Sequence, residues 1–456
     1  MQIDAAGGIT QMEANAAPKS KRVMGIWMAL ALVMGSMIGS GVFLLPAGLA
    51  PLGWNSVFGW LITVAGTLCM ATVFARLARS FPHAGGPYAF TRAAFGTGPA
   101  FAVAWAYWIS LWVGNAAIAT AAVSYLSRLI PALGAPGISA VVTVALVWLF
   151  TLINLRGAAL AARVQLVSTI VKLVPLLAVI ALAAWVLMRE GTTPVLPFAS
   201  ADINISSIAL ATTLTLWAML GIEAATVPAD CVRDPERTIP RATLLGTGAA
   251  GLIYIFVCSA VVLMLPAAMV AASEAPFADF VDTYWGINAG TAIAAFGSIS
   301  ALGALNGWIM CQAELPAAIA RDGLFPSWLA KLSGRGVPVN SHILSSSLLS
   351  VVVLLNSTKS MAKLFEFLIL LTTSITLVMY LGCALAAARL MVTGEIKRGV
   401  GFACVVIAAL VYSIWTVIGA GLEAVLWGLA LLAVGVPVYL AMRKVQRGVP
   451  SNATSA

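Results

Sequence analysis

The stretch Gly35-Ser36-Met37-Ile38-Gly39-Ser40-Gly41-Val42-Phe43 lies in the middle of an apolar run over residues 24–49. Its glycines and serines are poor helix interior, because each glycine costs about 1 kcal/mol relative to alanine. One interpretation is a close packing face, since small residues spaced four apart let helices approach. The other is an unwound segment in which the amides of Ser40, Gly41 and Val42 open a second half-helix, and a helix N-terminus is suited to hold a carboxylate.

The composition predicts a membrane protein. Of the 456 residues, 61% are hydrophobic and 9% are charged, which excludes an ordinary soluble composition. Nearly every stretch between short polar interruptions reaches the roughly 20 apolar residues that a helix needs to cross a bilayer. We therefore predict an all-α integral membrane protein with about twelve spans. The predicted spans are 24–49, 54–78, 97–128, 138–155, 164–188, 206–232, 240–268, 288–320, 338–357, 363–389, 401–420 and 424–442.

Helices explain these runs better than the strands of an outer-membrane barrel. Barrel strands alternate apolar and polar residues, whereas these runs are apolar all round and contain Gly and Pro. The first run follows a polar tail over residues 1–23 and lacks the short apolar core and cleavage site of a secretory signal. We expect it to remain attached as the first helix.

The formal net charge of +9 could suggest a nucleic-acid partner. On the helical prediction, however, most basic residues fall on the side of the membrane that holds the N-terminus. That side is the cytoplasm by the positive-inside rule, so we expect both termini there, in a multi-pass protein of the bacterial inner membrane, and no nucleic-acid partner. The basic residues on that side are Lys19, Lys21, Arg22, Arg76, Arg79, Arg92, Arg156, Arg163, Arg233, Arg237, Arg241, Arg321, Lys331, Arg335, Arg389, Lys397, Arg398, Arg443, Lys444 and Arg447. Those on the opposite side are Arg128, Arg189, Lys359 and Lys363.

No enzyme, metal or channel motif is present in the sequence. The six cysteines lie within or at the ends of apolar spans without paired metal-ligand spacing, and His83 and His342 belong to no HExxH-like pattern. The loop acids Asp230, Asp234 and Glu236 lie among arginines, which favours a cytoplasmic ion-pair network over an acid–base pair. A channel would need a filter of repeated carbonyls or a ring of like charges. We expect no catalytic residue, no metal and no cofactor.

We single out two charged residues that lie inside apolar spans. Glu223 follows Gly221 in the sixth span, where an ionisable group is costly and marks a functional site unless it makes a structural hydrogen bond to a neighbouring helix. Lys172, in the fifth span, either snorkels to the cytoplasmic edge or, if buried, exchanges a proton or supplies a fixed charge where other carriers place a sodium ion. The first and sixth spans open two five-helix halves, the expected place for paired discontinuous helices in an inverted-repeat transporter.

Four segments carry a family resemblance. They are GSMIGSGVFLLP at 35–46, FPHAGGPYAF at 81–90 with YWISLWVGN at 107–115, WAMLGIEAA at 217–225 followed by RDPERTIPRA, and LGALNGW with RDGLFP within 302–326. With these segments, which cover most of the first nine helices, the chain resembles the amino acid, polyamine and organocation (APC) transporters. Within them it is most similar to the basic amino acid and polyamine antiporter group, which includes bacterial arginine–agmatine antiporters.

The resemblance implies a five-plus-five inverted repeat that works by alternating access, with two extra C-terminal helices and often a homodimer. Its parts would be a cytoplasmic tail at 1–23, a first repeat at 24–189, a second repeat at 205–390, helices eleven and twelve at 400–443 and a C-terminal tail at 444–456. The partners it implies are a small amino acid or amine as substrate, membrane lipid and, in some members, a coupled proton.

The resemblance also implies roles for individual residues. The amides of Ser40 and Gly41 and the Ser40 hydroxyl would hold the substrate carboxylate, and the carbonyls of Trp217, Ala218 and Leu220 would accept from the α-ammonium. Met37 would be a further contact with the substrate. Trp217 would lie over the stem or cationic head of the substrate, where a ring face attracts positive charge. Further contacts implied in this way are Ser110, Leu111, Asn115 and Thr372. The gating residues implied are Trp308 as middle gate, Tyr107 with Glu223 as outer pair, Glu223 as proton sensor, and Trp217.

Two residues depart from the arginine exchangers. Ser36 stands where they have asparagine, and Lys172 stands where they have a small apolar residue. The lysine instead resembles related carriers of neutral amino acids. The first interpretation is therefore an antiporter that exchanges a basic amino acid with its amine product or with another amino acid. The second is a proton-coupled symporter of neutral amino acids, with Lys172 as its protonation site.

Overall fold

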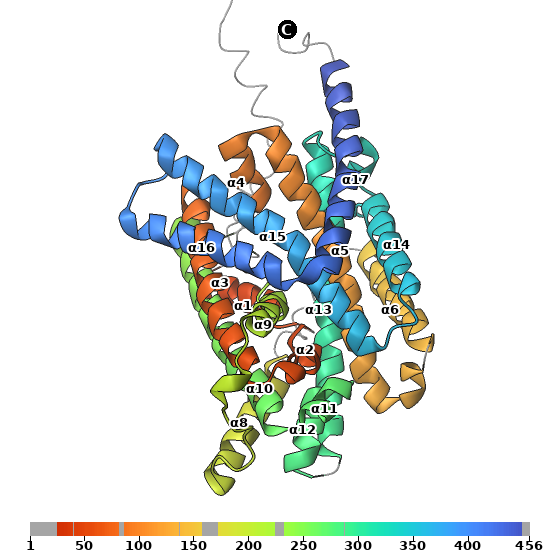
Figure 1. The fold of residues 1–456 in the computed structure, drawn as a ribbon. Helices are drawn as coiled ribbons and strands as arrows, with labels where there is room; N and C mark the ends of the chain where they lie inside the picture. The colour runs from red at the N-terminus through yellow and green to blue at the C-terminus, as the bar shows by residue number, and fades with distance from the viewer. Residues whose placement is uncertain are drawn as a thin grey trace, which may run out of the picture.

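The computed structural model describes residues 25–39, 41–81, 86–135, 137–156, 172–223, 232–286 and 288–448. These residues form a bundle of α-helices without a strand (Figure 1). The helices of the first half are α1 (Ile26–Met37), α2 (Gly41–Leu49), α3 (Trp54–Ser80), α4 (Gly86–Phe95), α5 (Thr97–Leu129), α6 (Ile138–Leu155) and α8 (Leu173–Glu190). Those that follow are α9 (Ile205–Ala218), α10 (Pro235–Met264), α11 (Ala267–Ala272), α12 (Pro276–Tyr284), α13 (Ala289–Arg321), α14 (Val339–Leu355), α15 (Met361–Thr393), α16 (Val400–Gly419) and α17 (Gly421–Gly448). Short 3-10 turns cover Ala50–Leu52, Pro131–Gly134, Ser200–Asp202 and Ser327–Ala330.

The helices confirm the expectation of a polytopic membrane protein. In the described part, nine helices are long and apolar enough to cross a bilayer, α1 and α2 form a tenth span bent by 41°, and α9 and α14 are shorter apolar helices. These positions match the roughly twelve predicted spans. The short helices α4, α11 and α12 were not predicted, because six to ten residues are too few to give a span-length apolar signal.

The long helix α5 is the centre of the bundle and α17 lies at its edge. In α5, 94% of the most apolar stretch is buried, against 11% in α17, whose large apolar side chains are exposed where lipid would contact them. Since α5 packs along both α13 and α15, it forms the support against which the broken helices are held.

Helices that hold corresponding places in the two halves of the chain pack against each other. The pairs are α3 with α10, α5 with α13 and α6 with α14, which are the second, third and fourth spans of each half. Two repeats related by a two-fold axis would bring such counterparts together.

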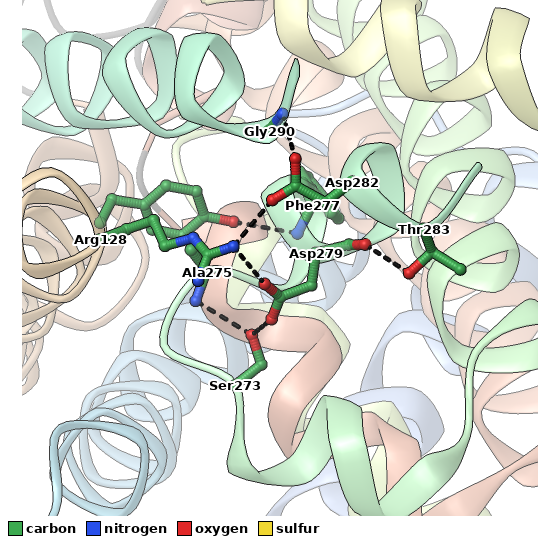
Figure 2. A network of polar contacts seen from close by, with 9 residues as sticks. Arg128, Ser273, Ala275, Phe277, Asp279, Asp282, Thr283 and Gly290 are labelled. Carbon is green, nitrogen blue, oxygen red and sulfur yellow. Dashed lines mark hydrogen bonds and ion pairs between the residues drawn. The ribbon is translucent and has the colours of Figure 1, made fainter. Parts of the chain in front are cut away.

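An ion-pair cluster closes the end of the bundle formed by α11 and α12, the lower end in Figure 1. Arg128 at the end of α5 lies 2.7 Å from a carboxylate oxygen of Asp282 and 3.5 Å from one of Asp279, both on α12 (Figure 2). The other oxygen of Asp282 accepts from the backbone of Gly290 at 2.8 Å, and Ser273 donates to Asp279. The cluster therefore ties the segment between α10 and α13 to the central helix.

Candidate functional site

A cavity lies where the broken helices meet α5, α13 and α15. Its empty space is about 540 Å³, including the space open at its mouth. The residues singled out from the sequence that line it are Met37, Gly41, Tyr107, Ser110, Leu111, Asn115, Trp217, Leu220, Glu223, Trp308 and Thr372. The lining residues that were not singled out are Gly39, Gly114, Ile118 and Thr376, and Ser36 was noted only as a departure. Ala218 is buried outside the lining, and Ser40 lies outside the described residues.

The first break follows Met37. Ile38 has left helical geometry with ψ 87°, and the N–H of Gly39 donates to Met37 O at 2.9 Å, whereas a continuous helix would direct it to Gly35 O. A new helix, α2, begins at Gly41. The first N–H groups of a helix have no acceptor within it, so the start of α2 offers backbone donors at the cavity.

Two buried side chains bind the carbonyls at this break. Lys172 Nζ donates to Gly35 O at 3.0 Å, and the hydroxyl of Tyr254 donates to Met37 O at 2.8 Å. Lys172 is 1% exposed, so the interpretation that it snorkels to the membrane edge is wrong. It does not line the cavity; it takes the place of the helical N–H that Gly39 no longer supplies, at the end of a helix where a cation is favoured. Nothing in the local sequence of Tyr254 indicates this contact, which depends on how α10 packs against α1.

The second break follows Ala218 at the end of α9. The N–H of Leu220 donates to Trp217 O at 3.2 Å in a turn. This carbonyl, which the resemblance assigns to the substrate ammonium, therefore already has one hydrogen-bond partner. Gly221 has φ +103°, a conformation that glycine adopts readily and other residues rarely. A Cβ at this position would lie 3.1 Å from the Cβ of Ser36, so the two breaks meet there.

The indole of Trp217 fills the space between α2 and α5. A Cβ built on Gly41 would lie 2.7 Å from its Nε1, and one built on Gly114 would lie 3.3 Å from its six-membered ring. Its Nε1 has no hydrogen-bond partner among the described residues. The two glycines therefore make room for a large ring with an available donor beside the start of α2.

Glu223 is held by two tyrosines. Tyr107 on α5 donates to one carboxylate oxygen at 3.1 Å, and Tyr380 on α15 donates to the other at 3.3 Å. Glu223 is 2% exposed and lines the cavity in addition to bonding to neighbouring helices. Tyr380 was not predicted from the sequence. It lies two helical turns beyond Thr372, which was singled out on the same helix, and this periodicity could have indicated it.

The serine and threonine hydroxyl groups around the cavity are arranged as acceptors. Each donates its proton to a carbonyl of its own helix: Ser36 to Leu32, Ser110 to Tyr107, Thr372 to Leu368 and Thr376 to Thr372, all at 2.7–2.8 Å. Because a hydroxyl has one proton, each oxygen is left to accept from a ligand. The walls from α5 and α15 thus favour a ligand with N–H groups. In the described part, no group of three His, Cys, Asp or Glu could hold a metal ion.

Comparisons with known proteins agree with this architecture. A family model described as amino acid permease matches residues 24–444. The cadaverine/lysine antiporter of Escherichia coli K12 is 32% identical over 74% of this chain and 77% of its own length. A putative arginine/ornithine antiporter of Bacillus subtilis is 30% identical over 91% of this chain and 96% of its own. The putrescine transporter PotE of Haemophilus influenzae is 29% identical over 92% and 97%, respectively.

Proposed function

Because this chain belongs to the amino acid permease family of the APC superfamily, we propose that it exchanges a basic amino acid for its amine product or for another amino acid. It is a membrane transporter in the group of basic amino acid and polyamine antiporters, as its relatives are. Because the identities are about 30%, the substrate pair is inferred from the chemistry of the cavity and not from the relatives.

The distribution of donors and acceptors in the cavity is the observation that carries this proposal. The start of α2 and Trp217 Nε1 offer donors on one side, which suit a carboxylate. The hydroxyl oxygens of Ser110, Thr372 and Thr376 offer acceptors, which suit an ammonium or guanidinium group. A basic amino acid presents both kinds of group, and its apolar stem would lie along the ring of Trp217.

Alternating access would arise from movement of the two broken helices against α5 and α13. In this mechanism the chain forms two inverted repeats, 24–189 and 205–390, and the packing of counterpart helices supports that division. Glu223 with Tyr107 and Tyr380 would close the cavity toward one side of the membrane, and Trp308 would separate the substrate from the other side of the membrane.

We also propose that both ends of the chain face the cytoplasm, with the protein in the inner membrane of a bacterium. Arg92 of α4 pairs with Asp322 after α13 at 3.5 Å, which puts Arg321 at the same end of the bundle as α4. The same end in Figure 1 holds the end of α17, where Arg443 and Lys444 lie. A clustering of basic residues at one end supports this orientation.

The test is uptake into proteoliposomes. Radiolabelled arginine, lysine, ornithine, agmatine, putrescine and alanine are each offered with and without unlabelled substrate inside. We expect uptake of a cationic substrate that depends on internal substrate. Uptake of alanine alone, driven by a proton gradient, would refute the proposal.

The same experiment decides on the second candidate, a proton-coupled symporter of neutral amino acids. The observation that favours it is Lys172, a buried basic group bonded directly to the first break, where a change of protonation would alter a backbone contact. Its distinguishing result is gradient-driven alanine uptake that is lost in Lys172→Ala.

A further inference from the structure

A second pocket lies between the end of α3 and the starts of α10 and α16. Its empty space is about 720 Å³, including the space open at its mouth. Arg76 and Arg79 line it from α3, and Gly401, Phe402 and Val405 line it from α16. None of its lining residues belongs to the substrate cavity, so the pocket is a separate feature of the bundle.

The two arginines bring positive charge to this pocket. Arg76 donates from Nη2 to Lys397 O at 3.3 Å, and its guanidinium carbon lies 5.2 Å from the centre of the Phe402 ring. These contacts hold the side chain without neutralising it, and Arg79 is exposed at the last turn of α3. In the part of the chain that the structure describes, no carboxylate forms an ion pair with either arginine. Because a guanidinium has five N–H donors, both arginines can still bind an anion.

No acid within the pocket competes for these charges among the described residues. The acids nearest to its lining along the sequence are Glu236 in the first turn of α10 and Glu395 before α16. Both are exposed, and neither lines the pocket. Lys397 and Arg398 follow Glu395 and add positive charge before α16. The pocket is therefore suited to an anion.

The outward side of α3 leads from an apolar surface to this pocket. Leu61, Ala65 and Leu68 are exposed or half-buried at helical spacing, and the same stripe continues to Arg76 and Arg79. The neighbouring helices α10 and α16 also expose large apolar side chains, among them Leu252, Phe256, Val411 and Ile414. A lipid tail could lie along the stripe of α3 while the phosphate of the same lipid reaches the arginines.

We propose that this pocket binds the phosphate headgroup of an anionic membrane phospholipid, with one acyl chain along the apolar stripe of α3. The planar fork of an arginine bonds two phosphate oxygens at once. Basic pockets between transmembrane helices at the membrane edge bind headgroups of this kind. A lipid bound there would contact α3 and α16 together and help to hold α16 on the bundle.

Gly401 provides a variant that tests the charge of the pocket without touching either arginine. It is exposed in the first turn of α16, and a Cβ built on it meets nothing within 4 Å, so a side chain fits there. Gly401→Glu puts a carboxylate at the pocket and should weaken binding of the anionic lipid by about fivefold, the effect of one charge. Gly401→Gln has nearly the same shape without the charge and should bind like the wild type.

The arginines themselves have a matched control at Arg389. Its guanidinium carbon lies 5.4 Å from the centre of the Phe95 ring, much as that of Arg76 lies over Phe402, but it does not line the pocket. The double variant Arg76→Gln with Arg79→Gln should weaken binding of the anionic lipid by about 30-fold. Arg389→Gln should leave it unchanged. An equal loss in both would mean attraction by the basic surface as a whole and would overturn the proposal.

The measurement is a titration of the purified full-length protein in detergent, with the bound molecules counted by native mass spectrometry. The probes are dioleoyl phosphatidylglycerol, dioleoyl phosphatidylcholine with the same tails and no net charge, and water-soluble glycerol 1-phosphate. We expect the first phosphatidylglycerol to bind about 30-fold more tightly than phosphatidylcholine, and glycerol 1-phosphate not to bind at the same concentrations.

Three results would overturn the proposal. They are equal binding of the two lipids, binding that Gly401→Glu and the double arginine variant leave unchanged, and binding of glycerol 1-phosphate as tight as that of phosphatidylglycerol, which would indicate a site for a free anion. The titration contains no amino acid, so its outcome is independent of the proposed exchange.

Discussion

We expect the variant Lys172→Met to bind substrate more weakly without a matching loss of stability of the folded protein. In the native protein Lys172 supplies the hydrogen bond that Gly35 O would receive from Gly39 N–H in a continuous helix. Methionine has a similar length and no donor, so Gly35 O loses this partner while the break is present. An unsatisfied buried acceptor costs about 1–3 kcal/mol.

The cost falls on the broken conformation alone, because a continuous helix would satisfy Gly35 O internally. If the substrate binds only the broken form, and the continuous form is the more populated one without substrate, the apparent dissociation constant rises by about 5- to 140-fold for that energy range. The folded protein as a whole need not be less stable, since replacing an isolated buried charge by an apolar side chain also removes a desolvation cost.

The assay is equilibrium binding of radiolabelled arginine to the purified protein, combined with thermal unfolding of the same samples. Lys363→Met, at an exposed position at the start of α15, is the matched control and should bind like the wild type. Binding by Lys172→Met within twofold of the wild type would refute the reasoning. So would a loss of affinity that only follows a loss of folded protein.

Two further variants test the contacts around the cavity. Gly41→Ala places a Cβ 2.7 Å from Trp217 Nε1, an overpacking of about 1–3 kcal/mol that should reduce arginine exchange by roughly 5- to 140-fold. Gly248→Ala, where a Cβ meets nothing within 4 Å, should leave exchange unchanged, and equal effects of the two would contradict the account. Tyr380→Phe removes one of the hydrogen bonds to the Glu223 carboxylate and should slow exchange by about tenfold, as measured by initial rates in proteoliposomes; an unchanged rate would show that the contact has no part in gating.

The positions of the spans could be predicted because a bilayer demands long apolar runs. The predicted span 138–155 coincides with α6, and the predicted spans 288–320 and 338–357 differ from α13 and α14 by at most two residues at each end. Short helices such as α12 carry no such signal, since they are fixed by tertiary contacts like that between Asp282 and Arg128.

The backbone breaks could be located from glycine and from charge. Gly39 and Gly41 indicated the first break, and Gly221 with Glu223 indicated the second. What residue types could not show is which side chains bind the freed carbonyls. Lys172 left two interpretations open, and only its burial and its hydrogen bond to Gly35 O in the folded bundle decided between them.

The polar side chains that connect to Asn115 through hydrogen bonds could not be predicted from the sequence. Gln312, Ser346 and Thr151 lie on three different helices and are individually ordinary residues of transmembrane helices. Their hydrogen bonds join positions up to 197 residues apart, between Asn115 and Gln312. These contacts exist only in the folded bundle.

The measurement that tests exchange most directly is efflux of radiolabelled arginine from preloaded proteoliposomes diluted into buffer with or without an external basic amino acid. Obligatory exchange around one cavity predicts rapid efflux with external substrate and almost none without it. Efflux at the same rate into substrate-free buffer would contradict exchange and would indicate a carrier that returns empty.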